Sequence, residues 1–428
     1  MRKYGKMILS GMLLICLCTG CKGPEQEITA DRETEETVLE VYAGQSEKES
    51  LGLLAEAFEE ENPEISVNLH FIPDSEYTQQ MMKIKNQEAE ADCIFFPDTG
   101  DAVLWREKGI LKDLTEWSED SPVLSYYQNW YANMEEDEKY SMVPYRIGRI
   151  CVYYNKTLFD AQEISYPQEG WTWEALKETA VQLTGWSGNE KVYGAPGFEA
   201  SGYWWTLPAR TRGAVDPFRE EDLAVFQETA QWCHEFTSDF SGPFSYAEWG
   251  DDVENNYYTL FLEGRLGMFF GDDTEVKILN QDIQERGLSL EYDIVSLPAW
   301  NGGEYTDVFN TAVASVAEMS AHPDEAFRFI EFCTGEKGAG ILAENNTAPA
   351  WQTDEICEIY LSSAENPAGR EYFLMREVPA ETAVGTLYQG GMEIMRQQVS
   401  LYLMDQQELE YTFRNIRREL DELSELNW

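Results

Sequence analysis

Two pairs of aspartates stand where carboxylates could contact a ligand. Asp98 and Asp101 follow a short apolar run, and Asp272 and Asp273 follow the apolar run 268–270. Each pair therefore comes at the carboxyl end of a predicted buried strand, where ligands bind in α/β sheets. Asp is also favoured at the start of a helix, so either pair could instead cap the helix that follows it. No DxDxDG pattern follows the second pair, and we expect no metal site and no cofactor.

Three consecutive aromatic residues, Tyr203, Trp204 and Trp205, offer flat apolar faces with polar rims. Consecutive side chains cannot all point the same way in a regular element, so at least one should face a groove or solvent. We single out Trp204 and Trp205 as candidate ligand platforms. The alternative is that all three side chains belong to the core.

The elements that must position these residues alternate between strands and helices. Apolar spacing predicts strands over 38–43, 65–72 and 92–97 and helices over 48–61 and 77–90. This β-α-β-α-β order implies parallel strands with helical crossovers. Gln45 and Ser46 follow the first of these strands, so they become candidate ligand contacts by the same argument as the aspartates. The alternation continues along the chain, which indicates an α/β fold, and 386–426 is predicted to be helical in at least two pieces.

The charge of the chain excludes one large class of partner. Asp and Glu number 79 against 31 Lys and Arg, a formal net charge of −48. So acidic a surface repels phosphate backbones, and we expect no nucleic-acid binding. The chain has three His, which leaves little for a His-based metal site or catalytic triad. Its 428 residues are about right for two large lobes.

The N-terminus has the features of an export signal. Basic residues within the first six positions precede the apolar run 7–17, which is too short for a stable transmembrane helix. Small residues then lead to Cys21, and the segment resembles a bacterial lipoprotein signal, although Cys18 stands where that pattern usually has Leu. We expect a signal peptide over 1–20, a lipid on Cys21, a flexible acidic tether over 21–37 and a location on the outer face of the cell membrane. The alternatives are release after cleavage and an uncleaved anchor.

Five sequence blocks resemble family 1 extracellular solute-binding proteins, a family that includes maltose-binding protein. The blocks are FEEENPEISV from Phe58, PYR with YYNKTLF from Pro144, GWTWEAL from Gly170, FLEGRLGM from Phe261 and HPDEA from His322. Each block alone is weakly specific, but all five occur in the family's order between about residues 38 and 351. Most members of this family feed sugars to ABC importers.

The resemblance implies a two-lobe α/β fold of the periplasmic-binding-protein class II type, with a hinge between the lobes. One lobe would contain 38–147 and 298–346, and the other 148–297 and 347–428. The chain would cross between the lobes three times, so that closure is a hinge motion. A ligand that touches both lobes would stabilise the closed form through its differential affinity.

The same resemblance bears on the candidate contacts. The family places a sugar-stacking aromatic near the two tryptophans, ligand contacts just after the strand that precedes the second aspartate pair, and a further aromatic at the position of Trp351. Arg146 lies at the first crossing, where its guanidinium could hold ligand hydroxyls or form an internal salt bridge. Asn310 lies near the returning crossing and is also a candidate.

The function implied is that of a lipid-anchored, monomeric receptor that captures a mono- or oligosaccharide and delivers it to the permease of an ABC importer. No bond would be made or broken. A glycoside hydrolase would instead need two carboxylates across a scissile bond, and among 79 acidic residues such a pair can be found anywhere. A surface protein that senses or adheres to glycans is a third possibility. The sequence does not name the sugar, its length or its linkage.

Overall fold

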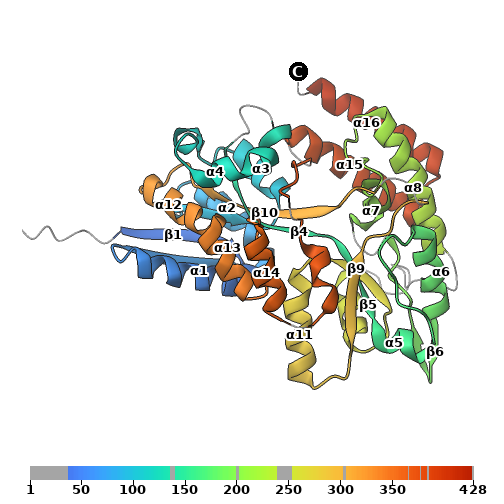
Figure 1. Ribbon diagram of the computed structural model, residues 1–428. Coiled ribbons are helices and arrows are strands. Elements are labelled where there is room, and N and C mark those ends of the chain that lie inside the picture. The colour runs from blue at the N-terminus through green and yellow to red at the C-terminus, as the bar shows by residue number, and fades with distance from the viewer. Residues whose placement is uncertain are drawn as a thin grey trace, which may run out of the picture. The chain divides into compact units, whose positions relative to one another are not determined.

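A computed structural model describes residues 37–134, 140–198, 202–238, 253–301, 305–364, 366–375, 377–382 and 385–426. The predicted signal peptide, Cys21 and the tether up to residue 36 lie outside the described residues. These described residues belong to one compact unit that contains two larger β-sheets and several packed helices (Figure 1).

The first sheet has the strand order β2-β1-β3-β10-β4. Strands β1, β2 and β3 are parallel, and β10 runs antiparallel to both β3 and β4. The elements are β1 Thr37–Gly44, α1 Lys48–Glu61, β2 Ile65–Ile72, α2 Tyr77–Lys85, β3 Cys93–Phe96, α3 Thr99–Glu107, α4 Pro122–Tyr126, β4 Val143–Arg149, β10 Phe309–Val316, α12 Pro323–Thr334 and α13 Glu336–Glu344. The predicted β-α-β-α-β order is confirmed, although α2 ends before residue 90 because Gln87 takes a left-handed backbone conformation.

Burial explains why these segments form a layered structure. Every side chain of β3 is buried, as expected for a strand covered on both faces. Helix α1 buries Leu51, Leu54, Ala55 and Phe58, which recur at helical spacing. The crossovers from β1 to β2 and from β2 to β3 run in opposite directions, so their right-handedness places α1 and α2 on opposite sides of the sheet (Figure 1).

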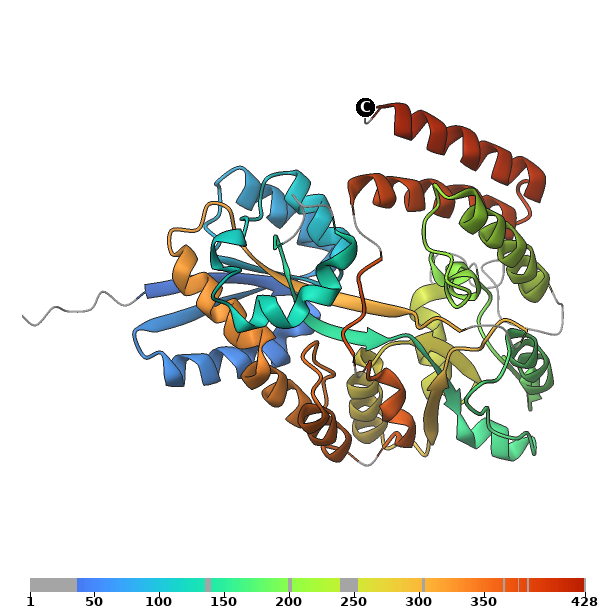
Figure 2. The ribbon, with the colours of Figure 1, turned by 45° about the horizontal axis from the view of Figure 1, so that its top comes forward.

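The second sheet has the order β8-β5-β9, with both outer strands antiparallel to β5. Only Ile150 separates β4 from β5, so one extended segment leads directly from the first sheet into the second (Figure 2). The elements are β5 Cys151–Asn155, α5 Lys156–Ala161, α6 Trp173–Leu183, β6 Gly185–Ser187, β7 Glu190–Val192, α7 Leu207–Arg210, α8 Glu220–Ser238, α10 Val253–Leu262, β8 Met268–Gly271, α11 Thr274–Arg286 and β9 Tyr292–Ser296. Strands β6 and β7 form a separate hairpin.

The C-terminal part of the chain is divided between the two cores. Helix α14, Asp354–Ser362, packs against α13, and residues 375 and 378 pack against the core of the first sheet. Helices α15, Thr386–Leu403, and α16, Leu409–Leu426, contribute to the core of the second sheet. We expected all of 347–428 to pack with the second sheet. Residues 375 and 378 pack with the first core instead, because the chain returns to that core before α15 begins.

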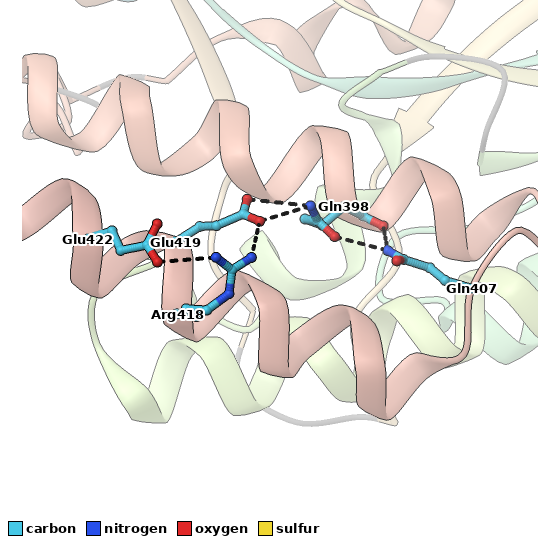
Figure 3. A network of polar contacts seen from close by, with 5 residues as sticks. All are labelled: Gln398, Gln407, Arg418, Glu419 and Glu422. Atoms are coloured by element: carbon cyan, nitrogen blue, oxygen red, sulfur yellow. Dashed lines mark hydrogen bonds and ion pairs between the residues drawn. The ribbon is translucent and has the colours of Figure 1, made fainter.

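Helices α15 and α16 form an antiparallel pair joined by polar contacts as well as by apolar packing. The amide of Gln398 donates to Glu419, and the amide of Gln407 donates to the carbonyl and side-chain oxygens of Gln398 at 2.9 and 3.1 Å (Figure 3). Arg418 pairs with Glu419 and Glu422 (Figure 3). The Gln398–Glu419 contact links α15 to α16, the Gln407 contacts link α15 to the connecting turn, and both Arg418 pairs lie within α16. The first turns of α15 carry side chains into the cavity described next.

Candidate ligand-binding site

A cavity of about 530 Å³ lies where elements of both cores meet. It is lined from α3, from the start of β10, from the segment that leads into α7, from Glu381 and from the first turns of α15. The lining residues are Asp98, Thr99, Gly100, Asp101, Leu104, Tyr203, Thr206, Arg210, Phe309, Asn310, Thr311, Glu381, Tyr388, Gln389 and Met392. The cavity therefore combines aromatic faces, carboxylates, amides and one guanidinium.

A second cavity of about 240 Å³ shares part of this lining. Tyr203, Thr206, Arg210, Phe309 and Asn310 line both cavities. The second cavity adds Trp204, Tyr257, Phe270, Asp272 and Glu275 among others. The shared residues make the two cavities neighbouring parts of one site, and the predicted candidates Asp98, Asp101, Asn310, Trp204 and Asp272 all line it.

The N-terminus of α3 places the first aspartate pair at the cavity. Asp98 is the N-cap, and its Oδ1 accepts a hydrogen bond from the backbone N–H of Asp101 at 2.8 Å. The capping alternative therefore holds for Asp98, which nevertheless lines the cavity. Burial raises the pKa of Asp98, and burial together with the charge of Asp98 raises the pKa of Asp101 to about 6. These carboxylates are poorly solvated, so a ligand that donates hydrogen bonds to them would be favoured.

Helix α15 approaches α3 closely at one side of the cavity. A Cβ on Gly100 would come within 2.8 Å of the amide nitrogen of Gln389. A residue with no side chain at position 100 is therefore what lets the Gln389 amide lie against the first turn of α3. Because α15 belongs to the second core and α3 to the first, this contact joins the two cores beside the cavity.

Buried polar residues that sequence reasoning had missed also line the larger cavity. The hydroxyl of Thr99 donates to Glu381 Oε2 at 3.1 Å. Glu381 is 4% exposed, and its backbone N–H donates to the carbonyl of Trp130 at 3.1 Å. Thr311 is 2% exposed, and its hydroxyl has no hydrogen-bond partner among the described residues. No motif surrounds Glu381 or Thr311, because their position depends on segments far apart in the chain.

The three consecutive aromatic residues diverge as expected, because the 3₁₀-helix over Trp204–Thr206 turns each side chain by about a third of a turn. Tyr203 is 52% exposed and lines both cavities, although we had not chosen it. Trp204 is partly buried, packs edge-on against Tyr257 and Phe270, and lines the second cavity. Trp205 is 1% exposed and its Nε1 donates to the carbonyl of Gly202, so the structure corrects its assignment from platform to core residue.

The two aspartates of the second pair also differ, since only Asp272 lines this site. Asp272 lines the second cavity, and its Oδ1 accepts hydrogen bonds from the backbone N–H and the hydroxyl of Thr274 at 3.0 and 2.6 Å. Asp273 is buried, and its Oδ2 accepts the backbone N–H of Ala348 at 2.7 Å. Burial and the neighbouring Asp272 raise the pKa of Asp273 to about 6. Asp273 occupies the N-cap position of α11 but makes no cap hydrogen bond through its side chain, which instead ties α11 to the segment after α13. Asp272 precedes the cap and accepts its hydrogen bonds from the first residue of the helix.

The remaining candidates lie elsewhere. Arg146 forms the internal salt bridge that we gave as its alternative, with Glu47 at 2.5 Å. These two residues, Ser46 and Asp273 line a separate cavity of about 200 Å³. Gln45 is exposed at the end of β1. Trp351 stacks on Tyr126 with ring centroids 3.7 Å apart and packs against the core of the first sheet, so its ring is held by protein contacts.

Within the part of the chain that the structure describes, no group of three or more His, Cys, Asp or Glu is placed to hold a metal ion. None of the described helices is both long and apolar enough to cross a membrane.

Comparison with known proteins decides the family. Residues 44–340 match the sequence profile of the bacterial extracellular solute-binding proteins. The chain belongs to this family. It is 22% identical over 382 residues to a binding protein of Brucella abortus, and the match covers 85% of each chain.

Solved structures agree with this fold. A sugar transporter protein of Rhizobium etli, in an open conformation, has a TM-score of 0.73 and 22% identity, with 90% of this chain and 99% of that one covered. An ABC substrate-binding protein of Listeria monocytogenes in complex with cycloalternan has a TM-score of 0.73 and 21% identity, with 90% and 98% covered. The two-lobe α/β fold predicted from the sequence is thereby confirmed. The family is one of binding proteins, so this solute-binding protein is not an enzyme.

Proposed function

We propose that this solute-binding protein captures a carbohydrate in the site formed by the two neighbouring cavities and delivers it to the permease of an ABC importer. The observation that carries this proposal is the lining of the site, where Tyr203 and Trp204 offer aromatic faces beside Asp101, Arg210 and Asn310. Sugars present C–H faces that pack on aromatic rings and hydroxyls that exchange hydrogen bonds with planar polar groups. The structural neighbours described as a sugar transporter and as a cycloalternan complex support the same ligand class.

Capture would involve closure of two lobes about the extended segment from β4 into β5. The lobe division given above, 38–147 with 298–346 and 148–297 with 347–428, is part of this proposal, amended by the packing of Met375 and Val378 against the first core. A ligand held by α3 on one side and by the Tyr203 segment on the other contacts elements of both cores. Its binding would therefore favour the closed form. Small-angle scattering should show a smaller radius of gyration at saturating ligand.

Carbohydrate binding is tested by a thermal-shift screen over a panel of saccharides. A ligand at ~100 times its dissociation constant stabilises the folded state by roughly 2.7 kcal/mol, which gives a measurable rise in melting temperature. Turnover assays on the same panel should show no hydrolysis. A panel in which no saccharide stabilises the protein would contradict the proposal.

Attachment to the outer face of the membrane through a lipid on Cys21 completes the proposed function. The support is the charged start, the short apolar run and the small residues before Cys21. The test compares Cys21→Ala with the unchanged chain by membrane fractionation and by labelling with a fatty-acid analogue. The variant should lose the label and leave the membrane fraction. A variant that stays labelled and membrane-bound would refute lipidation at this position.

A further inference from the structure

Arg210 differs from the other charged residues of the site in its sign and in its contacts. It is the only Lys or Arg among the residues that line either cavity, and it is partly exposed there. Within the part of the chain that the structure describes, its guanidinium forms no hydrogen bond and no ion pair. Arg212, two residues along the chain, instead pairs with Glu228 at 2.7 Å and lies 5.1 Å from the centre of the Trp300 ring. Although the chain has 79 acidic residues, Arg210 therefore has donors to offer to a ligand.

The local structure directs Arg210 toward that ligand. Tyr203, Thr206 and Arg210 recur at spacings of three and four residues through the 3₁₀-helix and α7, which follow one another without a break. Such spacing places side chains on one face of a helical segment, and all three residues line both cavities. Pro208 and Ala209 of the same segment are buried, so the backbone that carries Arg210 is anchored in the second core.

Arg210 lies where the two cavities meet, because it belongs to the lining of both. The larger cavity includes residues of α3 and α15, and the smaller one includes Trp204, Tyr257 and Asp272. A chain of sugar units that occupies both cavities would therefore pass Arg210, whereas a single unit would use only part of this lining. The geometry favours a ligand of more than one unit.

The chemistry of the guanidinium restricts the group that it binds. Its five N–H donors form a planar fork with no acceptor, which fits either a carboxylate or two adjacent hydroxyl oxygens. A carboxylate on the ligand would be repelled by the acidic residues that line the same cavities. Adjacent hydroxyls fit both charges, because each oxygen can accept from the guanidinium while its hydrogen is donated to a carboxylate. The acidic lining residues are Asp98, Asp101, Asp272, Glu275 and Glu381.

We propose that Arg210 is a specificity-determining residue of this site, and that its guanidinium binds two adjacent oxygens of a neutral oligosaccharide that extends into both cavities. The inference rests on the proposed function, since it narrows the ligand class of the same site. Tyr203, which lies on the same helical face, places its ring beside the sugar unit that Arg210 binds.

The first experiment measures which saccharides bind to the unchanged protein. Isothermal titration at about pH 7 would cover glucose, galactose and mannose, the trisaccharides maltotriose, cellotriose and mannotriose, and the ionised glucuronic and galacturonic acids. We expect one of the neutral trisaccharides to bind roughly tenfold or more tightly than its own monosaccharide, because it reaches both cavities. We expect each uronic acid to bind no more tightly than its neutral counterpart.

Three variants connect binding to Arg210. Arg210→Met should weaken binding of the best-bound trisaccharide roughly tenfold or more, since hydrogen bonds to a charged group are lost. Arg210→Lys keeps the charge without the planar fork, so it should restore only part of that loss. Arg212→Met, the matched control, removes the same charge outside the cavities and should leave the dissociation constant unchanged. All three should melt within about 1–2 °C of the unchanged protein without ligand, because both arginines are partly exposed.

Singly deoxygenated derivatives of the same trisaccharide test the two adjacent oxygens without relying on a variant. Removal of either of two neighbouring hydroxyls should weaken binding to the unchanged protein roughly tenfold. In Arg210→Met the same removal should weaken binding about threefold or less, because the fork that bound those oxygens is gone. Small and uniform losses at every position of the trisaccharide would overturn the inference, even if Arg210→Met folds poorly.

The outcomes separate this inference from the proposed function. If a neutral saccharide binds and Arg210→Met or Arg210→Lys binds it as tightly as the unchanged protein, the role of the Arg210 fork is overturned and carbohydrate binding stands. Tighter binding of a uronic acid than of its neutral counterpart, or of a monosaccharide than of its trisaccharide, would overturn the ligand class. If no saccharide of the panel binds, the carbohydrate function itself fails, and the inference fails with it.

Discussion

Alanine substitution of Tyr203, Trp204 and Trp205, one at a time, should change folding stability and ligand binding to three different extents. Trp205→Ala removes a buried ring that packs on Phe226 and a donor that satisfies the carbonyl of Gly202. Truncation of a buried Trp costs about 3–5 kcal/mol of folding free energy. At roughly 2 °C per kcal/mol for a chain of this size, the melting temperature should fall by about 6–10 °C.

Trp204→Ala should divide its effect between the fold and the ligand. The edge contacts of Trp204 with Tyr257 and Phe270, at 5.0 and 5.5 Å between centroids, are worth about 0.5–1.5 kcal/mol each. The fold should therefore lose about 1–3 kcal/mol. Loss of the face that lines the cavity should cost binding about 1–3 kcal/mol, or roughly one to two decades in dissociation constant. Tyr203→Ala should cost the fold about 0.5 kcal/mol or less, because its ring is half exposed.

The assay is thermal unfolding of the three variants without ligand, followed by titration with the saccharide that gives the largest shift in the panel. The ligand-induced change in Trp fluorescence should shrink in Trp204→Ala. The reasoning fails if Trp204→Ala binds normally, or if Trp205→Ala keeps the melting temperature of the unchanged protein. Weakened binding in Tyr203→Ala with unchanged binding in Trp204→Ala would place the platform on the tyrosine instead.

Three further predictions concern stability. Burial raises the pKa of Asp101 from 3.8 to about 6, so the folded chain keeps this proton where the unfolded chain releases it, and the free energy of unfolding falls as pH rises through that window. After allowance for partial exposure, the change in free energy of unfolding caused by Asp101→Asn should therefore be more favourable at about pH 7 than at about pH 4, by about 1–2 kcal/mol. Equal changes in urea unfolding at the two pH values would contradict this. Gly194→Ala should prevent folding or lower the free energy of unfolding by several kcal/mol, because its Cβ would overlap a backbone carbonyl of α6. Gly52→Ala, which has open space around it in α1, should instead stabilise the fold by about 0.5–1 kcal/mol. Similar melting temperatures for the two variants would count against this packing. Arg146→Met should lower the free energy of unfolding by about 3–5 kcal/mol, because it leaves the Glu47 carboxylate buried without its partner. Adding Glu47→Gln to this variant should restore part of that loss, and a double variant less stable than the single one would disprove the pairing.

The sequence by itself determined the local elements and the edge of the sheet where a site could form. Apolar spacing is a local property, so the strands and helices of 38–97 were predicted nearly to their ends, and the turn at Gln87 accounts for the early end of α2. Asp98 and Asp101 could be chosen because strand ends in a parallel sheet share one edge, which follows from connectivity alone. The order of five motif blocks was enough to indicate the family that the comparison then established.

Only the tertiary structure decided which side chains face the cavity. Trp204 and Trp205 are equivalent in sequence, and they differ because Phe226 covers one ring while the other lines an open space. Glu381 and Thr311 reach the cavity beside Thr99 from segments that are 282 and 212 residues away from it, so no local pattern could bring them together. Exposure, charge repulsion and unmet hydrogen bonds arise from packing between distant segments, and these are the properties that make the cavity a site.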